Sequence, residues 1–394
     1  MNIPQLDSTY IANTYARFPV TIARGKGSLV WDADDKVYID MATGIAVNSF
    51  GIADPVWIRA VTEQLCTVQH ASNLYYTAPD AQLAQLLCEK TGMKKVFFSN
   101  SGAEANECLI KTARKWASDT KGEGEHPFVT LVNSFHGRTL TTVTATGQDT
   151  FHKFFGPFTP GFRYVPAGDL AALERQLDAE DCSAVLVEIV QGEGGVRALD
   201  ADYLKAVEAL CHEKNVLFCV DEVQTGNGRT GTWFAYEQFG LSPDLVSTAK
   251  GLGNGLPIGA TLMGPKTAEV LTPGTHGSTF GGNPVACAGA LSVLEQIDDA
   301  FLEAVKQKGA WLTAELEKIP GVKDVSGLGL MLGFSVEGCK SADIKAKALD
   351  NGLVVLTAKD RVRLLPPLAI TEEELSDGLL RLAAAIREVQ EAAH

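Results

Sequence analysis

A lysine lies at the end of an apolar segment and inside a run of small residues, where a reactive amine could be formed. The segment DLVSTAKGLGNGLPIG places Lys250 directly after a stretch with the composition of a buried strand. Burial disfavours the charged form of a lysine, and its free amine can then form a Schiff base with a carbonyl compound. A purely structural lysine is the competing interpretation. The glycine run is also compatible with a dinucleotide loop, although Pro257 interrupts it.

Two adjacent carboxylates, Asp221 and Glu222, end a second apolar run, VLFCVDE. Successive side chains of a strand face opposite ways, so the two carboxylates cannot share one environment. A carboxylate at the end of a buried strand needs a cation, and ligands bind at the carboxyl ends of strands in open α/β sheets. Three interpretations stay open: a partner for a cationic ligand, a plain salt bridge or helix cap, and a metal-binding acid. No GxxxxGK[ST] motif lies upstream to support the last.

A third segment, SNSGAEANE, joins a short apolar strand to a helix. Ser101 and Glu104 fit a capping box, and Gly102 and Ala103 are small enough for a ligand to approach the backbone. Free N–H groups and the helix dipole make such a start a site for phosphate. An ordinary helix start is the other interpretation.

Together these features favour one ligand that has a phosphate, a carbonyl and a protonated ring nitrogen. Pyridoxal 5′-phosphate has all three, with lysine on its aldehyde and a carboxylate on its pyridinium nitrogen. Phe135, in SFHGRT, supplies a ring that could stack on a planar cofactor, although an isolated phenylalanine more often belongs to a core.

Seven motifs in this order resemble the class III, ornithine aminotransferase-like, pyridoxal-phosphate aminotransferases. The resemblance runs from about Tyr15 to the C-terminus and is carried by SNSGAEANE, SFHGRT, EIVQGEGGV, VDEVQTGNGRTG, DLVSTAKGLGNGLPIG, HGSTFGGNP and VRLLPPL. Residues 52–55, IADP, depart from the pattern, because relatives usually have a histidine-containing segment there. The resemblance implies fold type I: an α/β large domain with a mostly parallel sheet covered by helices, and a smaller α+β domain.

The resemblance also implies roles for residues at the cofactor. Lys250 would carry the cofactor as a Schiff base, and Asp221 would hold the pyridinium nitrogen. The remaining cofactor contacts implied for the same subunit are Ser101, Gly102, Ala103, Phe135, Glu222, Val223 and Gln224. Thr279 would reach the phosphate of the neighbouring subunit, so the resemblance implies a homodimer with a shared active site.

Substrate contacts follow from the same resemblance. Arg363 matches the clamp for the α-carboxylate, and Glu193 matches the glutamate that pairs with this clamp and releases it. Arg138 matches a second carboxylate-recognition arginine, whereas Ser278 and Tyr15 would face substrate. Without the motifs, the arginines would be interpreted as surface or salt-bridged residues, Ser278 as a turn residue, and Glu188 as a carboxylate that satisfies nearby backbone groups.

The motifs NTYARFPV, GIAVNSFG and PGTHGSTFGGNP are most similar to bacterial members that act on N2-acetylornithine. The implied reaction moves the δ-amino group of N2-acetylornithine to 2-oxoglutarate, giving N-acetylglutamate 5-semialdehyde and glutamate, as in arginine biosynthesis. Ornithine, succinylornithine and N-succinyl-diaminopimelate remain alternative donors, because no motif encodes the shape of the acyl pocket. A glutamate-1-semialdehyde-type aminomutase is an alternative reaction, and a non-enzymatic cofactor-binding protein is an alternative of another class.

Composition excludes several other kinds of protein. The 394 residues carry 34 Lys and Arg against 48 Asp and Glu, a net charge of −14, so a nucleic-acid partner is not expected. With 45% hydrophobic residues, the chain has enough apolar material for a large core. We see no secretory signal and no apolar run that could span a membrane, and we expect a cytoplasmic protein. The eight cysteines form no CxxC pair and the histidines no HExxH, so no metal is expected.

Alternation of short apolar runs with helical periodicity predicts the elements that position these residues. Strands are expected at 95–99, 128–133, 184–189, 216–220 and 245–248, with helices at 103–116 and 201–213 between them. A hairpin is expected around Asp34 and Asp35. From Gly309 the pattern becomes α+β, with helices at 311–318, 342–351 and 372–392 and strands at 331–336 and 362–364. We therefore expect an N-terminal segment, 1–50, that belongs to the small domain, a large cofactor-binding domain, 51–308, and a C-terminal small domain, 309–394.

Overall fold

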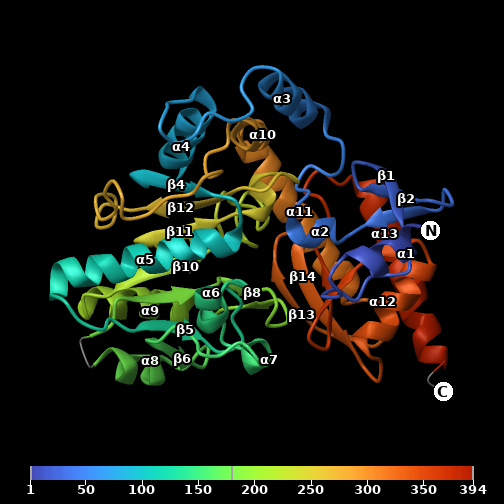
Figure 1. The fold of residues 1–394 in the computed structure, drawn as a ribbon. Helices are drawn as coiled ribbons and strands as arrows, with labels where there is room; N and C mark the ends of the chain where they lie inside the picture. Colours follow the sequence, from blue (N-terminus) through green and yellow to red (C-terminus); the bar gives the residue numbers. More distant parts are fainter. Residues whose placement is uncertain (1, 179–180, 393–394) are drawn as a thin grey trace.

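The computed structural model describes residues 2–178 and 181–392, and a seven-stranded sheet lies at its centre (Figure 1). The strand order is β4-β12-β11-β10-β7-β5-β6, and only β12 runs antiparallel to its neighbours. The bounds are β4 (Lys95–Ser99), β5 (Phe128–Leu131), β6 (Phe162–Val165), β7 (Ala184–Val187), β10 (Leu217–Asp221), β11 (Leu245–Thr248) and β12 (Gly259–Met263). The mostly parallel sheet is confirmed, and all five predicted strands belong to it, whereas β6 and β12 were missed.

Apolar side chains on both faces of the strands explain why the sheet is buried between helices. In β10, Phe218 and Val220 pack on one side with α8 (Leu170–Leu177) and α9 (Ala201–Glu213), whereas Cys219 packs on the other side with α5 (Gly102–Lys121). This alternation follows from the two-residue period of a strand. Figure 1 shows α5 running across one face of the sheet. The prediction of a helix at 201–213 is confirmed to the residue, and the helix predicted at 103–116 is longer than expected.

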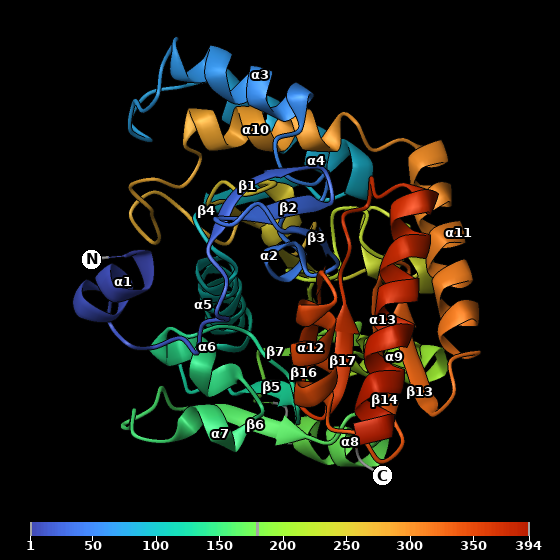
Figure 2. The same cartoon turned by 90° about the vertical axis from the view of Figure 1, so that its right-hand side faces the viewer.

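Three further helices cover the β4 end of the sheet: α3 (Pro55–Leu65), α4 (Ala78–Thr91) and α10 (Pro284–Leu294). α3 runs along α10 (Figure 2), and Gly289 permits this approach because an added Cβ would lie 2.9 Å from Nε1 of Trp57. The atypical residues 52–55 immediately precede and begin α3, where the Asp54 side chain caps the helix by accepting from the Trp57 N–H group. The residues IADP thus serve as a helix start. Two short helices, α6 (Leu140–Ala145) and α7 (Asp149–His152), follow β5.

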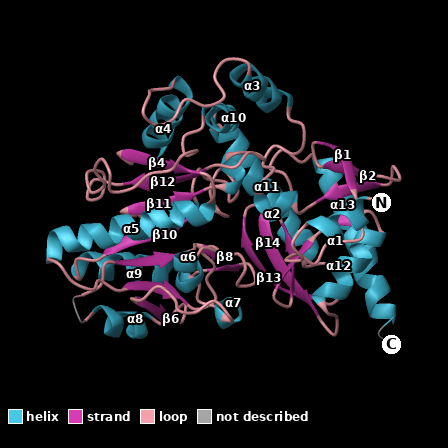
Figure 3. Ribbon diagram, in the orientation of Figure 1, coloured by secondary structure: helices cyan, strands magenta, loops and turns pink. Residues whose placement is uncertain are grey.

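A second body lies beside the large sheet (Figure 3) and is built from two four-stranded sheets. One has the order β1-β2-β3-β15 and the other the order β13-β14-β17-β16. The strand bounds are β1 (Ile22–Lys26), β2 (Leu29–Asp32), β3 (Val37–Asp40), β13 (Val322–Leu328), β14 (Met331–Val336), β15 (Leu353–Val354), β16 (Leu356–Ala358) and β17 (Arg361–Leu364); the helices are α2 (Thr43–Ala46), α11 (Asp299–Leu316), α12 (Ser341–Asp350) and α13 (Glu372–Ala392). The N-terminal helix α1 (Ile3–Tyr10) lies apart from this body (Figure 2) and has no buried residue. The predicted hairpin at Asp34 is confirmed as β2-β3, and β15 pairs with β3, so N-terminal and C-terminal segments share one sheet.

The start predicted for the first C-terminal helix, at residue 311, is wrong. α11 begins at Asp299 and passes without a break through Gly309. Gly309 does not end a helix: an added Cβ there would lie 2.4 Å from the carbonyl oxygen of Gly329, so the glycine permits close packing. Leu302 of this helix packs in the core of the large sheet, and Leu312 packs in the core of the second body. The domain division at 308 remains a prediction, and α11 crosses it. No helix within residues 2–178 and 181–392 is long and apolar enough to cross a membrane.

Candidate active site

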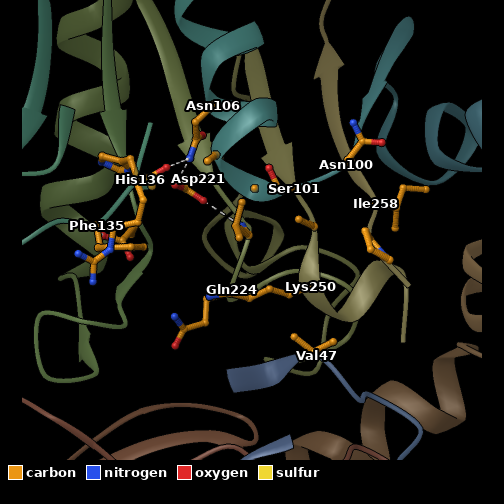
Figure 4. Close-up of a pocket in the computed structure, with 18 of the residues that line it drawn as sticks. Val47, Asn100, Ser101, Asn106, Phe135, His136, Asp221, Gln224, Lys250 and Ile258 are labelled. Carbon is orange, nitrogen blue, oxygen red and sulfur yellow. Dashed lines mark hydrogen bonds and ion pairs between the residues drawn. The ribbon is translucent and has the colours of Figure 1, made fainter. Parts of the chain in front are cut away.

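A cavity of about 390 Å³ lies at the carboxyl edge of the large sheet (Figure 4). Chain segments that follow β4, β5, β7, β10 and β11 meet there, which is where open α/β sheets bind ligands. Nine of the predicted site residues line the cavity: Ser101, Gly102, Ala103, Phe135, Arg138, Asp221, Val223, Gln224 and Lys250. The fold thus brings together segments that are far apart in the sequence.

Asp221 ends β10 and is held in a fixed position by three donors. One carboxylate oxygen, Oδ2, accepts from Nδ2 of Asn106 at 2.7 Å and lies 2.7 Å from Nδ1 of His136. The other oxygen, Oδ1, accepts from the backbone N–H group of Val223 at 3.0 Å. Asn106 also donates to the carbonyl oxygen of His136 at 2.8 Å, so the two residues form one network around the buried carboxylate (Figure 4). Such a carboxylate is oriented to meet a cationic group in the cavity.

Sequence reasoning missed Asn106 and His136. Both lie inside motifs that had been recognised, SNSGAEANE and SFHGRT. Asn106 is on the inner face of α5, and His136 follows Phe135, whose side chain was the one considered. The available signal was the presence of two polar side chains, a histidine and an asparagine, inside motifs already assigned to the cofactor site.

Lys250 follows β11 and opens a single 3₁₀ turn, Lys250–Leu252, at the cavity wall. Its φ of 46° lies in the left-handed region, which is unusual for a residue other than glycine. Desolvation lowers the pKa of Lys250, and the charge of Arg363 lowers it further, while Glu193, Asp221 and Glu188 oppose the shift. An amine with a lowered pKa is a better nucleophile and base near neutral pH.

The start of α5 faces the same cavity. The Ser101 hydroxyl accepts from the Glu104 N–H group at 3.2 Å, which confirms the helix cap. In the predicted capping box, the Glu104 carboxylate would accept from the N–H group of Ser101. It accepts instead from the N–H group of the preceding residue, Asn100, at 2.9 Å. The first N–H groups of a helix have no partner within it, so those of Gly102 and Ala103 suit an anion. Gly102 is required for packing, because an added Cβ would lie 2.6 Å from Val223.

Arg363, on β17 of the second body, pairs with Glu193. The two side chains approach to 2.6 Å, and the Arg363 side chain is only 3% exposed. The same guanidinium nitrogen lies 3.3 Å from Oε1 of Gln224, which lines the cavity. The predicted pair therefore forms and contacts the cavity wall through Gln224, although neither Arg363 nor Glu193 lines the cavity itself.

Glu188 follows β7 at the base of the cavity. Its carboxylate accepts from the N–H groups of Phe135 at 2.9 Å and Gly192 at 3.3 Å, as expected for a side chain that satisfies the backbone. Burial raises the pKa of Glu188 well above its usual value, and the charge of Asp221 raises it further. Arg138, at the cavity mouth, lies over the Phe151 ring at 4.3 Å and the Phe135 ring at 5.7 Å.

Glu222 does not line the cavity, so its predicted cofactor contact is wrong. Its side chain points away from Asp221, as strand alternation requires, and is fully buried. The carboxylate accepts from the Thr225 hydroxyl at 2.5 Å and from the Tyr236 N–H group at 2.9 Å. Burial raises the pKa of Glu222 to about 7. Glu222 is a structural residue of the large core.

Three other predicted residues lie outside the cavity within this chain. Tyr15 is 70% exposed and contacts Arg17. The Ser278 hydroxyl accepts from Nδ2 of Asn100, a residue of the cavity wall, at 3.2 Å. Thr279 lines a separate, smaller depression. The role expected for Thr279 requires a neighbouring subunit, so this position neither supports nor contradicts it.

The residues that line the cavity fit pyridoxal phosphate. A lysine with a lowered pKa, a buried carboxylate and a helix start are the three features that this cofactor requires. The Nε2 atom of buried His136 has no partner in the described part of the chain. Within the same part, no group of three or more His, Cys, Asp or Glu residues is placed to hold a metal ion.

The fold and this arrangement define an enzyme that uses a reactive lysine and a buried acid at a sheet edge. Residues 10–386 match the family model described as aminotransferase class-III, and the chain belongs to that family. It is 51% identical to the acetylornithine aminotransferase of Haemophilus ducreyi over 98% of this chain and 99% of that protein. The architecture is that of the fold type I pyridoxal-phosphate transferases.

Solved structures agree with this placement. The ornithine aminotransferase of Toxoplasma gondii, which shows partial occupancy of PLP at its active site, has a TM-score of 0.94 at 35% identity and covers 99% of this chain and 94% of that one. The N-acetylornithine aminotransferase of Stenotrophomonas maltophilia has a TM-score of 0.86 at 36% identity, over 98% of this chain and 99% of that one.

Proposed function

We propose that this protein is an acetylornithine aminotransferase that uses pyridoxal 5′-phosphate. It moves the δ-amino group of N2-acetylornithine to 2-oxoglutarate, giving N-acetylglutamate 5-semialdehyde and glutamate. The identity of 51% over nearly the full length of both chains to an enzyme with that name carries the proposal. The cavity supports it, because the lysine, the acid and the helix start that amino transfer requires lie at one sheet edge.

Pyridoxal phosphate, when bound, supplies an aldehyde that carries the amino group and a cationic ring that withdraws electrons from the substrate carbon. We propose that Lys250 Nζ binds the aldehyde and that the N–H groups of Gly102 and Ala103 bind the phosphate. Asp221 keeps the ring nitrogen protonated, and Asn106 and His136 keep the Asp221 carboxylate in place. Phe135, Val223 and Gln224 lie along the cavity walls and would enclose the ring.

Lys250 has a second role as the base. With cofactor and substrate bound, the neutral Lys250 amine would remove the proton from the substrate carbon. The lowered pKa of Lys250 makes this neutral form available. The oxo-acid acceptor returns the enzyme to its first state, so we expect ping-pong kinetics.

The Arg363–Glu193 pair explains how one site accepts two kinds of substrate. Glutamate presents its α-amine, whereas acetylornithine presents its δ-amine, so their carboxylates lie at different distances from the reacting nitrogen. We propose that Glu193 covers Arg363 when the δ-amine donor binds. For glutamate and 2-oxoglutarate, the pair opens and Arg363 grips the carboxylate with its planar guanidinium. We propose Arg138 at the cavity mouth as the second carboxylate contact. Ser278, which lies outside the cavity within this chain but beside Asn100 of the cavity wall, remains a predicted substrate contact. Tyr15 remains a predicted substrate contact.

A substrate panel tests the proposed activity. We expect acetylornithine to give the highest kcat/KM among acetylornithine, ornithine, succinylornithine, N-succinyl-diaminopimelate and 4-aminobutyrate, with glutamate formed from 2-oxoglutarate. If another donor gave the highest kcat/KM, the proposed specificity for the acetyl group would be wrong. Turnover of glutamate 1-semialdehyde without an oxo-acid would indicate an aminomutase. Lys250→Ala should abolish both turnover and the absorbance of the bound cofactor, whereas Lys214→Ala, in an ion pair outside the cavity, should change neither.

We propose in addition that the protein is a cytoplasmic homodimer with a shared active site. Large apolar side chains near Thr279 are exposed, among them Leu74, Tyr75, Tyr76 and Phe280, with Tyr76 fully accessible. Burial of such a patch favours association with a second copy.

A hybrid experiment tests the shared site. If Thr279 acts in the neighbouring subunit, a hybrid of Lys250→Ala and Thr279→Ala subunits holds one intact site and regains activity that neither parent has. If Thr279 acts in its own subunit, the hybrid gains nothing. Analytical ultracentrifugation gives the oligomeric state independently.

A further inference from the structure

Arg361 lies two residues before Arg363 on β17, and its buried guanidinium has no established purpose in the proposed reaction. Alternate residues of a strand face the same side, so Arg361 and Arg363 lie on one face of β17. Both reach the same loop: Arg363 reaches the Glu193 side chain, and Arg361 reaches the carbonyl oxygen of Gly195. Arg361 is 1% exposed. No carboxylate in residues 2–178 and 181–392 forms an ion pair with it. Burying a cation without an ion pair costs free energy. Hydrogen bonds to the Arg361 guanidinium must therefore compensate for its lost contacts with water.

Backbone carbonyl groups take the place of a carboxylate around Arg361. Its guanidinium donates to the carbonyl oxygens of Gly195 and Gly333, both at 2.6 Å, and to that of Asp324. It also donates to the Ser326 hydroxyl at 2.8 Å. Ser326 in turn donates to the carbonyl oxygen of Val196 at 2.6 Å. Two side chains of the second body, Arg361 and Ser326, therefore bind the carbonyl groups of two consecutive loop residues, Gly195 and Val196.

That loop, residues 192–196, carries Glu193. It joins the short strands β8 (Val190–Gln191) and β9 (Arg197–Ala198). Val196 is fully buried and has a φ of 55°, a left-handed conformation that a β-branched residue adopts only when its surroundings impose it. Gly333 leaves space for Val196, since an added Cβ would lie 2.7 Å from the valine side chain.

We propose that Arg361 is a positioning residue, which together with Ser326 fixes the loop 192–196 so that Glu193 stays against Arg363. The inference deepens the proposed function, since it assigns control of the Arg363–Glu193 pair to a residue outside the cavity. Burial lowers the pKa of Arg361 to about 10, so the side chain stays charged near neutral pH and keeps its donors.

Hydrogen exchange in the full-length holoenzyme tests the position of the loop. Removing a buried donor costs about 1 kcal/mol or more, so Arg361→Met should speed exchange in residues 190–198 by about fivefold or more. Ser326→Ala should act in the same direction, and Arg361→Lys should lie between Arg361→Met and the wild type. Arg381→Met is the matched control, because Arg381 also donates to a backbone carbonyl, that of Gly352, but away from the loop. Unchanged exchange in the loop for Arg361→Met and Ser326→Ala would overturn the proposal.

Binding of glutarate tests the consequence for Arg363. Glutarate has two carboxylates and no amino group, so it reports on access to Arg363 without turnover. If Arg361 holds Glu193 in place, Arg361→Met should tighten glutarate binding by about fivefold, and should add nothing in a Glu193→Ala background. An equal effect in both backgrounds would show that Arg361 acts on glutarate binding independently of Glu193 and would contradict the proposal.

Both readouts are independent of the amino donor. If acetylornithine proved not to be a substrate, the loop and glutarate experiments would still decide the role of Arg361. If Arg361→Met does not fold, Ser326→Ala carries both tests, because it removes one hydroxyl from a partly buried position.

Discussion

Nδ1 of His136 lies 2.7 Å from Oδ2 of Asp221, although the two residues are 85 positions apart in the sequence. β5 and β10 both deliver their carboxyl ends to the same edge of the sheet, with β7 between them. The carboxylate that would face the cofactor is thus held in place by side chains from two other segments of the chain.

We predict that His136→Phe lowers kcat by about tenfold or more, because a hydrogen bond to a buried charged group contributes about 1.5–3 kcal/mol. KM for the amino donor should change little, since His136 contacts the acid and not the substrate. Steady-state kinetics measure both quantities. His126→Phe, at the opposite end of β5, is the control. A raised KM with unchanged kcat would contradict the positioning role of His136.

Gly102→Ala should weaken cofactor binding by about tenfold, since overpacking costs about 1–3 kcal/mol and the new methyl group would meet Val223 at 2.6 Å. Val223→Ala removes the opposing methyl groups, so the double variant should recover part of the affinity. Titration of the apoenzyme with pyridoxal phosphate measures the effect. If Val223→Ala did not restore affinity in the double variant, the contact between the new methyl group and Val223 would not be the cause of the weaker binding.

Glu222 should make the protein less stable as pH rises. Its pKa is raised by burial to about 7 in the folded state, from 4.5 without burial. The unfolded chain therefore releases the proton first, and the stabilisation present below pH 4.5 is lost as pH rises to about 7, by about 3 kcal/mol in total. Relative to Glu222→Gln, the wild type should lose stability between pH 4.5 and 7 in urea denaturation. Exposed Glu373→Gln is the control, and parallel stability curves for wild type and Glu222→Gln would refute the assignment.

Glu193→Ala should change the two half-reactions by unequal factors. Without Glu193, Arg363 stays open, so the reaction with glutamate should be preserved while the reaction with acetylornithine slows by about tenfold, the effect of losing one charged pair. Stopped-flow absorbance of the cofactor measures each half-reaction separately. If Glu193→Ala changed both half-reactions by equal factors, Glu193 would have no role in selecting between the two substrates.

Much of the large body could be predicted from the sequence, because parallel strands that are apolar on both faces leave a strong pattern. The strands Lys95–Ser99 and Leu245–Thr248 were located to the residue. β12 was missed because GATLM follows a glycine-rich segment and no α-helix separates it from β11. The start of α11 was misplaced because a glycine that serves close packing has the same sequence signal as one that ends a helix.

Residues expected to contact the ligand directly could be predicted from the sequence. Residues that position another residue were harder to predict. Lys250 and Asp221 were selected because an amine and an acid beside apolar runs demand an explanation, and both line the cavity. Strand alternation showed that Asp221 and Glu222 must separate but not which one faces the cavity. Arg361, Asn106 and His136 depend on contacts between distant segments, which no local pattern contains.

The antiparallel strand β12 has a further consequence. The segment from Lys250 to Gly259 is anchored at both ends in one sheet, next to the strand that ends in Asp221, whereas Arg363 belongs to a separate sheet. A movement between the two bodies would therefore shift Arg363, the proposed carboxylate contact, and leave the geometry of Lys250 and Asp221 unaltered. If these residues have the proposed roles, changes between the two bodies could alter the range of substrates without altering the groups that carry out the reaction.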